Sequence, residues 1–273
     1  MKIVRYENKQ GAVGYAAEME EALIEVEGNL AIGFTPTGIK VHAARLLAPV
    51  TPVSIFCIGL NYRRHAEETG AKIPKHPVLF MKGVNALNHP HDPILLPRAL
   101  ASGQVDFECE LAVVIGRSCK NVSRRDALKH VAGYTCANDV SARDWQKDWG
   151  GGQWCRGKTF DTFCPLGPRL VTPDEIPDPN ALRIQTRLNG QTMQDSNTGD
   201  MIFDVPALIE FLSGSTTLLP GTVILTGTPE GVGMARKPPV WLKSGDTVKV
   251  EIEGIGCLTN PVAEEKLPPS PQL

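Results

Sequence analysis

Two glutamates separated by one residue give this sequence its clearest chemical signal. In the segment VDFECELAVVIG, Glu108 and Glu110 lie in a run with strong strand character. Side chains two residues apart in a strand share a face, so the two carboxylates would lie side by side. Phe107, Cys109 and Leu111 would then face the opposite, apolar side. Like charges this close repel each other in a partly buried site unless a proton or a cation lies between them.

A third carboxylate could complete a metal site. Asp139, in GYTCANDVSARDWQ, follows an apolar run and is expected at the end of a strand. Oxygen-only ligands suit a hard cation such as Mg²⁺, Mn²⁺ or Ca²⁺ rather than zinc. The alternative is an exposed strand face whose glutamates pair with lysine or arginine. An isolated Glu-x-Glu pattern favours that alternative, but the neighbouring motifs favour the metal site.

An acid–base pair is predicted in CIGLNYRRHAEETG. His65 and Glu68 are three residues apart, so one helical turn would place them on a shared face. A carboxylate beside an imidazole orients the ring and favours its charged form, which suits a general base that works near neutral pH. The alternative is a solvated surface pair.

Further candidates lie in glycine-rich and apolar segments. The run LTGTPEGVG could direct backbone N–H groups and the hydroxyls of Thr226 and Thr228 at a carboxylate or phosphate. It has no Gly-Lys-Ser/Thr ending, which argues against a phosphate P-loop. Lys158 and Arg143 are cations in largely apolar segments, where an unpaired charge is costly to bury. They would either have an electrostatic role beside the carboxylates or simply neutralise charge.

The elements that must position these residues are mostly strands. Short apolar runs separated by Pro and Gly predict strands in LAVVIG, LRIQTRLNG, TVILTG and TVKVEIEGIG. Helices are expected over residues 39–47 (IKVHAARLL), 124–133 (RRDALKHVAG) and 205–214 (VPALIEFLSG). In the second helix, Ser123 is the expected N-cap and Gly133 the expected C-terminal glycine. The sequence therefore predicts a mixed, β-rich α+β fold, without the alternation of a Rossmann sheet.

Composition excludes several classes of protein. The 273 residues carry 28 Lys and Arg against 30 Asp and Glu, without a basic block, so no nucleic-acid partner is predicted. No apolar stretch reaches the roughly 18 residues of a membrane span, and the N-terminus lacks a signal-peptide pattern. Seven scattered cysteines without a Cys-x-x-Cys pair predict free thiols. We therefore expect a cytoplasmic protein that does not contact a membrane.

Six ordered segments resemble the fumarylacetoacetate hydrolase family. They extend over most of the chain, and DVSARDWQ and KTFDTFCPLGP are most similar to the subgroup called fumarylacetoacetate hydrolase domain-containing protein 2. Short β-like runs and a helical stretch predict a small N-terminal subdomain over residues 1–48, and the resemblance implies a β-roll catalytic domain over 49–273. The segments are GLNYRRHAEE, LFMKGVNAL, DFECELAVVIG, ANDVSARDWQ, GKTFDTFCPLGP and LTGTPEGVG.

The resemblance also implies a site, a cofactor and a homodimer. Mg²⁺ or Mn²⁺ would be bound by Glu108, Glu110 and Asp139. The catalytic residues would be His65 and Glu68, on a lid segment, and Lys158. Substrate contacts are expected from Thr228, Arg143, Gln146 and Lys82.

The substrate expected from this chemistry is a small 2-oxo acid. We expect first a metal-dependent hydrolase that cleaves a C–C bond in a 2,4-dioxo acid of the acylpyruvate or fumarylpyruvate type, through a pyruvate enolate. The alternative is a tautomerase that moves a proton between C3 and the enol oxygen of oxaloacetate, or an oxaloacetate decarboxylase. Ring-opened aromatic-catabolism isomerases and ureidoglycolate lyase are more distant options. A non-catalytic metal-binding scaffold is a third class, against which the acid–base pair argues.

Overall fold

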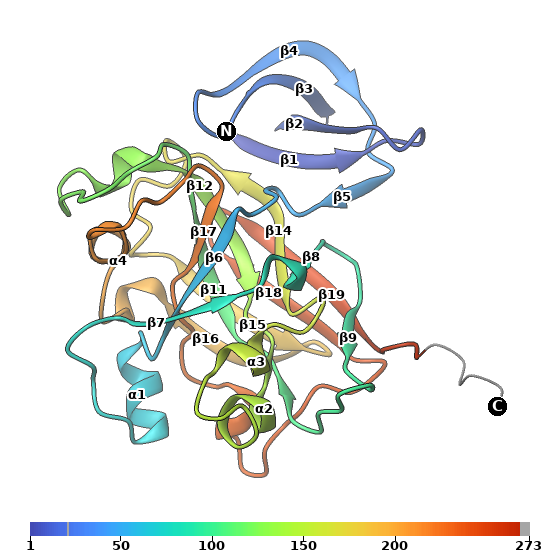
Figure 1. Cartoon of the computed structure of the whole chain (residues 1–273). Coiled ribbons are helices and arrows are strands. Elements are labelled where there is room, and N and C mark those ends of the chain that lie inside the picture. The colour runs from blue at the N-terminus through green and yellow to red at the C-terminus, as the bar shows by residue number, and fades with distance from the viewer. Residues whose placement is uncertain (21, 268–273) are drawn as a thin grey trace, which may run out of the picture.

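Two β-sheets form most of this protein, with short helices at their edges (Figure 1). The computed structural model describes residues 1–20 and 22–267. The mixed, β-rich α+β fold predicted from the sequence is confirmed. None of the helices in this described part of the chain is long and apolar enough to cross a membrane.

The larger sheet runs from the N-terminal strands to the strands that carry the site residues. β5 (Arg45–Leu47) pairs with β1, and β8 (Leu87–Asn88) pairs with β14. The main path through the sheet is β4 (Gly33–Val41), β3 (Ala22–Asn29), β2 (Val13–Met19), β1 (Lys2–Glu7), β14 (Cys164–Val171), β12 (Val131–Asn138), β11 (Cys109–Ile115), β17 (Thr222–Leu225), β6 (Ser54–Gly59) and β7 (Val78–Lys82).

The second sheet packs against the centre of the first. Its order is β16 (Gln191–Asn197), β15 (Arg183–Leu188), β18 (Thr247–Ile252), β19 (Gly256–Glu264) and β9 (Ile94–Leu96). β11 lies between two apolar clusters, because Leu111 and Val113 face one cluster while Ala112 and Val114 face the other. A strand that is buried on both faces reads as a continuous apolar run, and this explains the sequence LAVVI. A short ladder joins β10 (Val105–Asp106) to β13 (Ser141–Ala142).

The helices are short and lie around the sheets. They are α1 (Arg63–Thr69), α2 (Arg143–Lys147), α3 (Cys155–Lys158) and α4 (Val205–Ser213), with 3₁₀ turns at Val84–Ala86, Ala127–His130, Thr198–Asp200 and Gly233–Ala235. α4 confirms the helix predicted over VPALIEFLSG. The Asp204 side chain caps it by accepting a hydrogen bond from Ala207 N at 3.0 Å, and Leu208 and Leu212 are buried.

Two predicted helices are wrong. Residues 39–47 continue β4 and then form β5, because pairing with β3 and β1 decides their conformation. Residues 124–133 contain only the 3₁₀ turn Ala127–His130, after which β12 begins at Val131. Gly133 does not end a helix. It lies in β12, where a Cβ atom would lie 2.5 Å from Val171 O, so glycine permits the close approach of β14.

The N-terminal strands β1–β5 lie to one side of the rest of the chain (Figure 1). β1 nevertheless pairs with β14, with Lys2 opposite Val171, so these strands continue the larger sheet. A division into a subdomain 1–48 and a catalytic domain 49–273 therefore stays a proposal, and residues 268–273 lie outside the described residues. All seven cysteines are free, as predicted, and five of them are buried.

Candidate active site

The three predicted metal-ligating carboxylates converge where β11 and β12 lie side by side. Cys109, the first residue of β11, pairs with Asn138, the last residue of β12. Glu108 and Asp139 are therefore neighbours, and Asp139 N donates a hydrogen bond to Glu108 O at 2.9 Å. One carboxylate oxygen from each of Glu108, Glu110 and Asp139 lies within 4.8 Å of the others, and all three side chains are buried. The i, i+2 spacing and the strand-end position predicted from the sequence are both found here.

Two lysines support this cluster from inside the protein. Lys158 Nζ lies 2.7 Å from both Glu108 Oε2 and Asp139 Oδ2. Lys82 Nζ lies 2.5 Å from Asp139 Oδ1 and donates hydrogen bonds to Val140 O and Lys158 O. Lys82 is 2% exposed and lies behind the cluster rather than on the wall of the pocket. This placement indicates a supporting role, and the substrate contact predicted for Lys82 stays a prediction.

A fourth buried carboxylate, Asp106, anchors the predicted arginine. Arg143 Nε and Nη2 donate to Asp106 Oδ2 at 2.9 and 2.8 Å, and Nη2 also donates to Glu108 Oε1 at 2.7 Å. Arg143 Nη1 donates to Gln146 Oε1 at 2.9 Å, so the amide nitrogen of Gln146 is left for other contacts. Asp106 was not predicted from the sequence. Its spacing of two residues from Glu108, in the series Asp-x-Glu-x-Glu, is the signal that could have found it.

Burial and neighbouring charges shift the pKa values of the residues in this cluster. Burial alone would raise the pKa of Glu108, but Arg143 and Lys158 outweigh burial and hold that pKa well below its usual range. For Glu110, burial and the negative charges of Asp139 and Glu108 act in the same direction and raise the pKa well above its usual range. Burial would lower the Lys158 pKa, yet Asp139 and Glu108 raise it.

The residues present fit a divalent cation. Four buried carboxylates (Asp106, Glu108, Glu110 and Asp139) face three buried cations (Lys82, Arg143 and Lys158), which leaves one negative charge in excess. Burial, together with the charges of Asp139 and Glu108, raises the pKa of Glu110, and a cation bound beside it would favour its ionised form. Oxygen donors from three carboxylates are the ligands that Mg²⁺ and Mn²⁺ prefer.

Helix α1 brings the predicted acid–base pair to the same pocket. One turn of this seven-residue helix places His65 Nδ1 3.2 Å from Glu68 Oε2, and His65 lines the pocket while being 8% exposed. Gly231 N donates to both oxygens of Glu68, at 2.9 and 3.2 Å. Glu68 therefore orients the imidazole and also joins α1 to the loop after β17. His65 Nε2 is the ring nitrogen left for a substrate.

The glycine-rich loop after β17 binds the protein's own carboxylates. Gly227 N donates to Glu110 Oε2 at 2.6 Å, and Gly231 N donates to Glu68. Both glycines have positive φ angles, 99° and 95°, which other residues rarely adopt. The Thr226 hydroxyl donates to Leu111 O at 2.9 Å, so the prediction that it faces a ligand is wrong.

Thr228 lines the pocket, and its hydroxyl is oriented by Gln194. Gln194 Oε1 accepts hydrogen bonds from Cys109 N and the Thr186 hydroxyl, which fixes the orientation of the amide. Gln194 Nε2 then donates to Thr228 Oγ1 at 2.8 Å, so the Thr228 proton is left to donate into the pocket. Gln194 was not predicted from the sequence, because nothing local distinguishes it from a surface residue of a strand.

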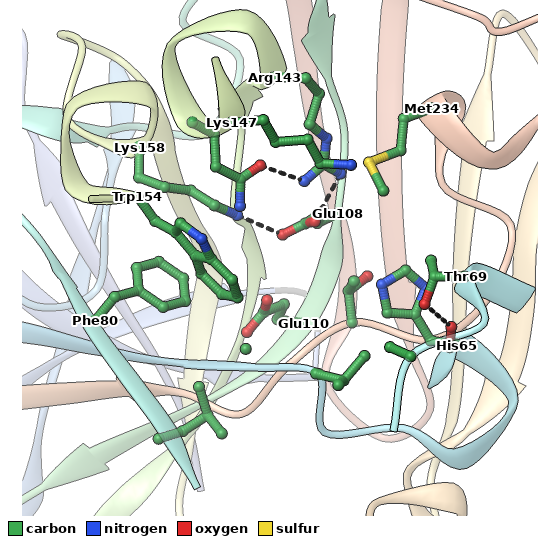
Figure 2. Close-up of a pocket in the computed structure, with 16 residues that line it drawn as sticks. His65, Thr69, Phe80, Glu108, Glu110, Arg143, Lys147, Trp154, Lys158 and Met234 are labelled. Carbon is green, nitrogen blue, oxygen red and sulfur yellow. Dashed lines mark hydrogen bonds and ion pairs between the residues drawn. The ribbon is translucent and has the colours of Figure 1, made fainter. Parts of the chain in front are cut away.

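These groups surround one pocket of about 310 Å³ (Figure 2). The carboxylates and His65 lie on different sides of it, and Phe80 and Trp154 form an apolar wall with ring centroids 5.5 Å apart. Asp139 and Lys82 lie behind the surface. The lining residues are Ile58, Gly59, Leu60, His65, Thr69, Ala71, Phe80, Glu108, Glu110, Arg143, Gln146, Lys147, Trp154, Lys158, Thr228 and Met234.

Comparison with known proteins places this geometry in a family. The family model described as fumarylacetoacetate (FAA) hydrolase C-terminal matches residues 54–263. The chain belongs to the fumarylacetoacetate hydrolase family. The predicted subgroup is confirmed by relatives such as the fumarylacetoacetate hydrolase domain-containing protein 2 homolog of Dictyostelium discoideum, 50% identical over 82% of this chain and 76% of that protein.

Several curated relatives in this family are named for a reaction. The mitochondrial oxaloacetate tautomerase of Xenopus laevis is 54% identical over 80% of this chain and 68% of that protein. A human protein of the same name is 52% identical over 79% of this chain and 68% of its own length.

Solved structures of the fumarylacetoacetate hydrolase family share the fold. A fumarylacetoacetate hydrolase from Exiguobacterium antarcticum superposes with a TM-score of 0.87 at 38% identity, covering 97% of this chain and 100% of that chain. A 5-carboxymethyl-2-hydroxymuconate delta-isomerase from Mycobacterium smegmatis gives a TM-score of 0.84 at 41% identity with the same coverage. The β-roll fold implied by the resemblance is thus confirmed.

Proposed function

We propose that this protein is an enzyme that interconverts the keto and enol forms of oxaloacetate. The observation that carries the proposal is that the acid–base pair of His65 and Glu68 and the carboxylate cluster face one pocket of about 310 Å³. Relatives named oxaloacetate tautomerase, at 52–54% identity, support this reaction over C–C hydrolysis. The hydrolase predicted first from the sequence is not confirmed.

Each residue has a defined part in the proposed reaction. Glu108, Glu110 and Asp139 would hold Mg²⁺ or Mn²⁺, which supplies Lewis-acid polarisation of the 2-oxo group when bound. Thr228 donates its hydroxyl proton to the C1 carboxylate of the substrate, and Gln194 keeps that hydroxyl oriented. The amide nitrogen of Gln146, left free by Arg143, provides a second donor at the wall.

Proton transfer is assigned to His65. With Nδ1 held by Glu68, His65 Nε2 removes a proton from C3 and delivers a proton to the oxygen on C2, so no atom is gained or lost overall. Phe80 and Trp154 exclude water from the apolar side of the pocket, which strengthens the polar contacts inside it. Lys158 keeps Glu108 and Asp139 in place while it lines the pocket.

The test starts from oxaloacetate supplied as its enol. The loss of enol absorbance is followed in dilute buffer with Mg²⁺ or Mn²⁺, and pyruvate formation is measured in parallel to detect decarboxylation. We expect rapid ketonisation without a matching release of pyruvate. His65→Ala should lower the rate by about 10²- to 10⁴-fold while metal binding is retained. The control is His42→Ala, which changes an exposed histidine outside the pocket. Equal rates for His65→Ala and the wild type would remove His65 from the mechanism.

Acylpyruvate hydrolysis is the second candidate. It is supported by the structural similarity to a protein named fumarylacetoacetate hydrolase, and by an acid–base pair that could equally activate water. Acetylpyruvate assayed under the same conditions distinguishes the two reactions. Rapid cleavage of acetylpyruvate without effect on enol-oxaloacetate would replace the tautomerase proposal.

The remaining predictions stay proposals. A non-catalytic scaffold would not be stabilised by oxalate in a metal-dependent way, whereas the proposed enzyme should be. A homodimer is proposed from the family resemblance alone. The location in the cytoplasm is likewise a prediction from the sequence, and the curated relatives are named as mitochondrial proteins.

A further inference from the structure

The pocket has one cation that the protein itself does not neutralise. Three cationic side chains line the pocket. Arg143 is bound to Asp106, Glu108 and Gln146, and Lys158 is bound to Glu108 and Asp139. Lys147 differs from both, since its ammonium group makes no ion pair and no side-chain hydrogen bond within residues 1–20 and 22–267. A pocket cation without a partner favours an anionic group on the ligand.

Helix α2 determines where this charge lies. Lys147 is the last residue of α2 and follows Arg143 by four positions, so both side chains lie on one face of the helix. Figure 2 draws both side chains on the same side of the pocket, above Glu108. Lys147 is exposed whereas Arg143 is buried, which places Lys147 toward the entrance and Arg143 next to the carboxylates.

Elsewhere among the described pocket residues, a second carboxylate would meet neutral donors such as the Gln146 amide, or cations that are already held in ion pairs. Phe80 and Trp154 form an apolar wall, and Glu108 and Glu110 would repel an anion that is not bridged by a metal ion. A substrate whose 2-oxo acid end lies at the carboxylate cluster therefore has two options for its distal end. An uncharged tail would lie against the aromatic wall, and a carboxylate would pair with Lys147, which lines the same pocket.

We propose that Lys147 binds the distal carboxylate of a dicarboxylic 2-oxo acid and so selects diacids over monoacids. The inference rests on the proposed function in one respect, that the 2-oxo acid end of the substrate binds at the carboxylate cluster. Lys147 takes no part in proton transfer. It determines which acids are held, and the preference for diacids should weaken as salt screens its exposed charge.

Malate and lactate test this inference without turnover. Both are 2-hydroxy acids, and they differ by the distal carboxylate. Their binding to the wild-type protein in excess Mg²⁺ is measured by isothermal titration calorimetry. An ion pair with an exposed lysine contributes up to about 1 kcal/mol, which corresponds to about fivefold in affinity. Wild-type protein should bind malate about fivefold more tightly than lactate, and the difference should shrink at high salt.

Substitutions of Lys147 assign the preference to this residue. Lys147→Met keeps the aliphatic side chain and should weaken malate binding about fivefold while lactate binding is unchanged. Lys147→Arg should restore the preference for malate. The matched control is Lys120→Met, which removes an equal charge from an exposed residue outside the pocket and should change neither affinity.

Two results would overturn the inference. One is a wild-type protein that binds malate no more tightly than lactate, or binds neither acid. The other is an unchanged ratio of affinities in Lys147→Met. These readouts are separate from tautomerisation, because a protein that prefers malate through Lys147 but leaves enol-oxaloacetate unchanged would contradict the proposed reaction and keep the diacid site.

Discussion

Replacing Asp106 with asparagine tests how much the buried charge cluster contributes to stability. Asp106 is fully buried and accepts five hydrogen bonds: two from Arg143, and one each from the backbone nitrogens of Phe107, Gly233 and Met234. Asparagine keeps the shape but removes the negative charge and turns one acceptor into a donor. That donor would face N–H groups that already donate, so at least one buried contact becomes repulsive.

The expected loss is large. Breaking a buried ion pair by removing one partner costs about 3–5 kcal/mol of unfolding free energy, because the other charge is left buried. An unfolding entropy of about 2.1 cal/mol/K per residue over 273 residues gives about 0.57 kcal/mol/K. The melting temperature of Asp106→Asn should therefore fall by about 5–9 °C.

Asp195→Asn is a matched control that separates the effect of burial from the loss of an Asp–Arg pair. Asp195 also pairs with an arginine through two contacts, with Arg183 at 3.1 and 2.9 Å, but both side chains are exposed. Asp195→Asn should cost no more than about 1 kcal/mol, or about 2 °C. Thermal unfolding of both variants is followed by circular dichroism in metal-free buffer, so that metal binding does not contribute. Equal shifts for the two variants would refute the reasoning from burial.

Three other changes test the site and the core. Glu110→Gln should weaken Mn²⁺ binding, measured calorimetrically, by more than about 10-fold, because one of three carboxylate ligands is lost; unchanged affinity would exclude Glu110 as a ligand. Gln194→Ala should raise the KM for oxaloacetate by freeing the Thr228 hydroxyl, and should cost about 1–3 kcal/mol by leaving the N–H of Cys109 without its acceptor; an unaltered KM would remove Gln194 from substrate positioning. Leu208→Ala should cost about 2–5 kcal/mol in urea unfolding by opening a cavity under α4, with kcat unchanged; a large loss of kcat would show that α4 supports the site.

Local spacing made several parts of the site predictable from the sequence. Glu108 and Glu110 share a face because they are two residues apart beside a strand, and His65 and Glu68 meet because they are three apart in a helix. The strands of the core were also predictable, since their apolar runs reflect burial on both faces. Helix α4 could be identified from its own residues because its buried positions, such as Leu208 and Leu212, recur at helical spacing.

Non-local pairing decided what the sequence could not. Residues 39–47 form strands because β3 and β1 lie beside them, and Gly133 is required by the backbone of β14 rather than by a helix end. Intrinsic propensity gave the wrong conformation for residues 39–47 because tertiary contacts outweighed it.

The sequence by itself determined which acidic and basic groups this protein has and which of them share a face. Only the tertiary structure decided how they are neutralised. Lys158 reaches Asp139 across 19 residues, and the backbone of Gly231 reaches Glu68 across 163. The tertiary structure also leaves Lys147 as the pocket cation without a partner among the described residues. The physical reason is that charge interactions in a buried site depend on distance in space and on exclusion of water, and neither follows from separation along the chain.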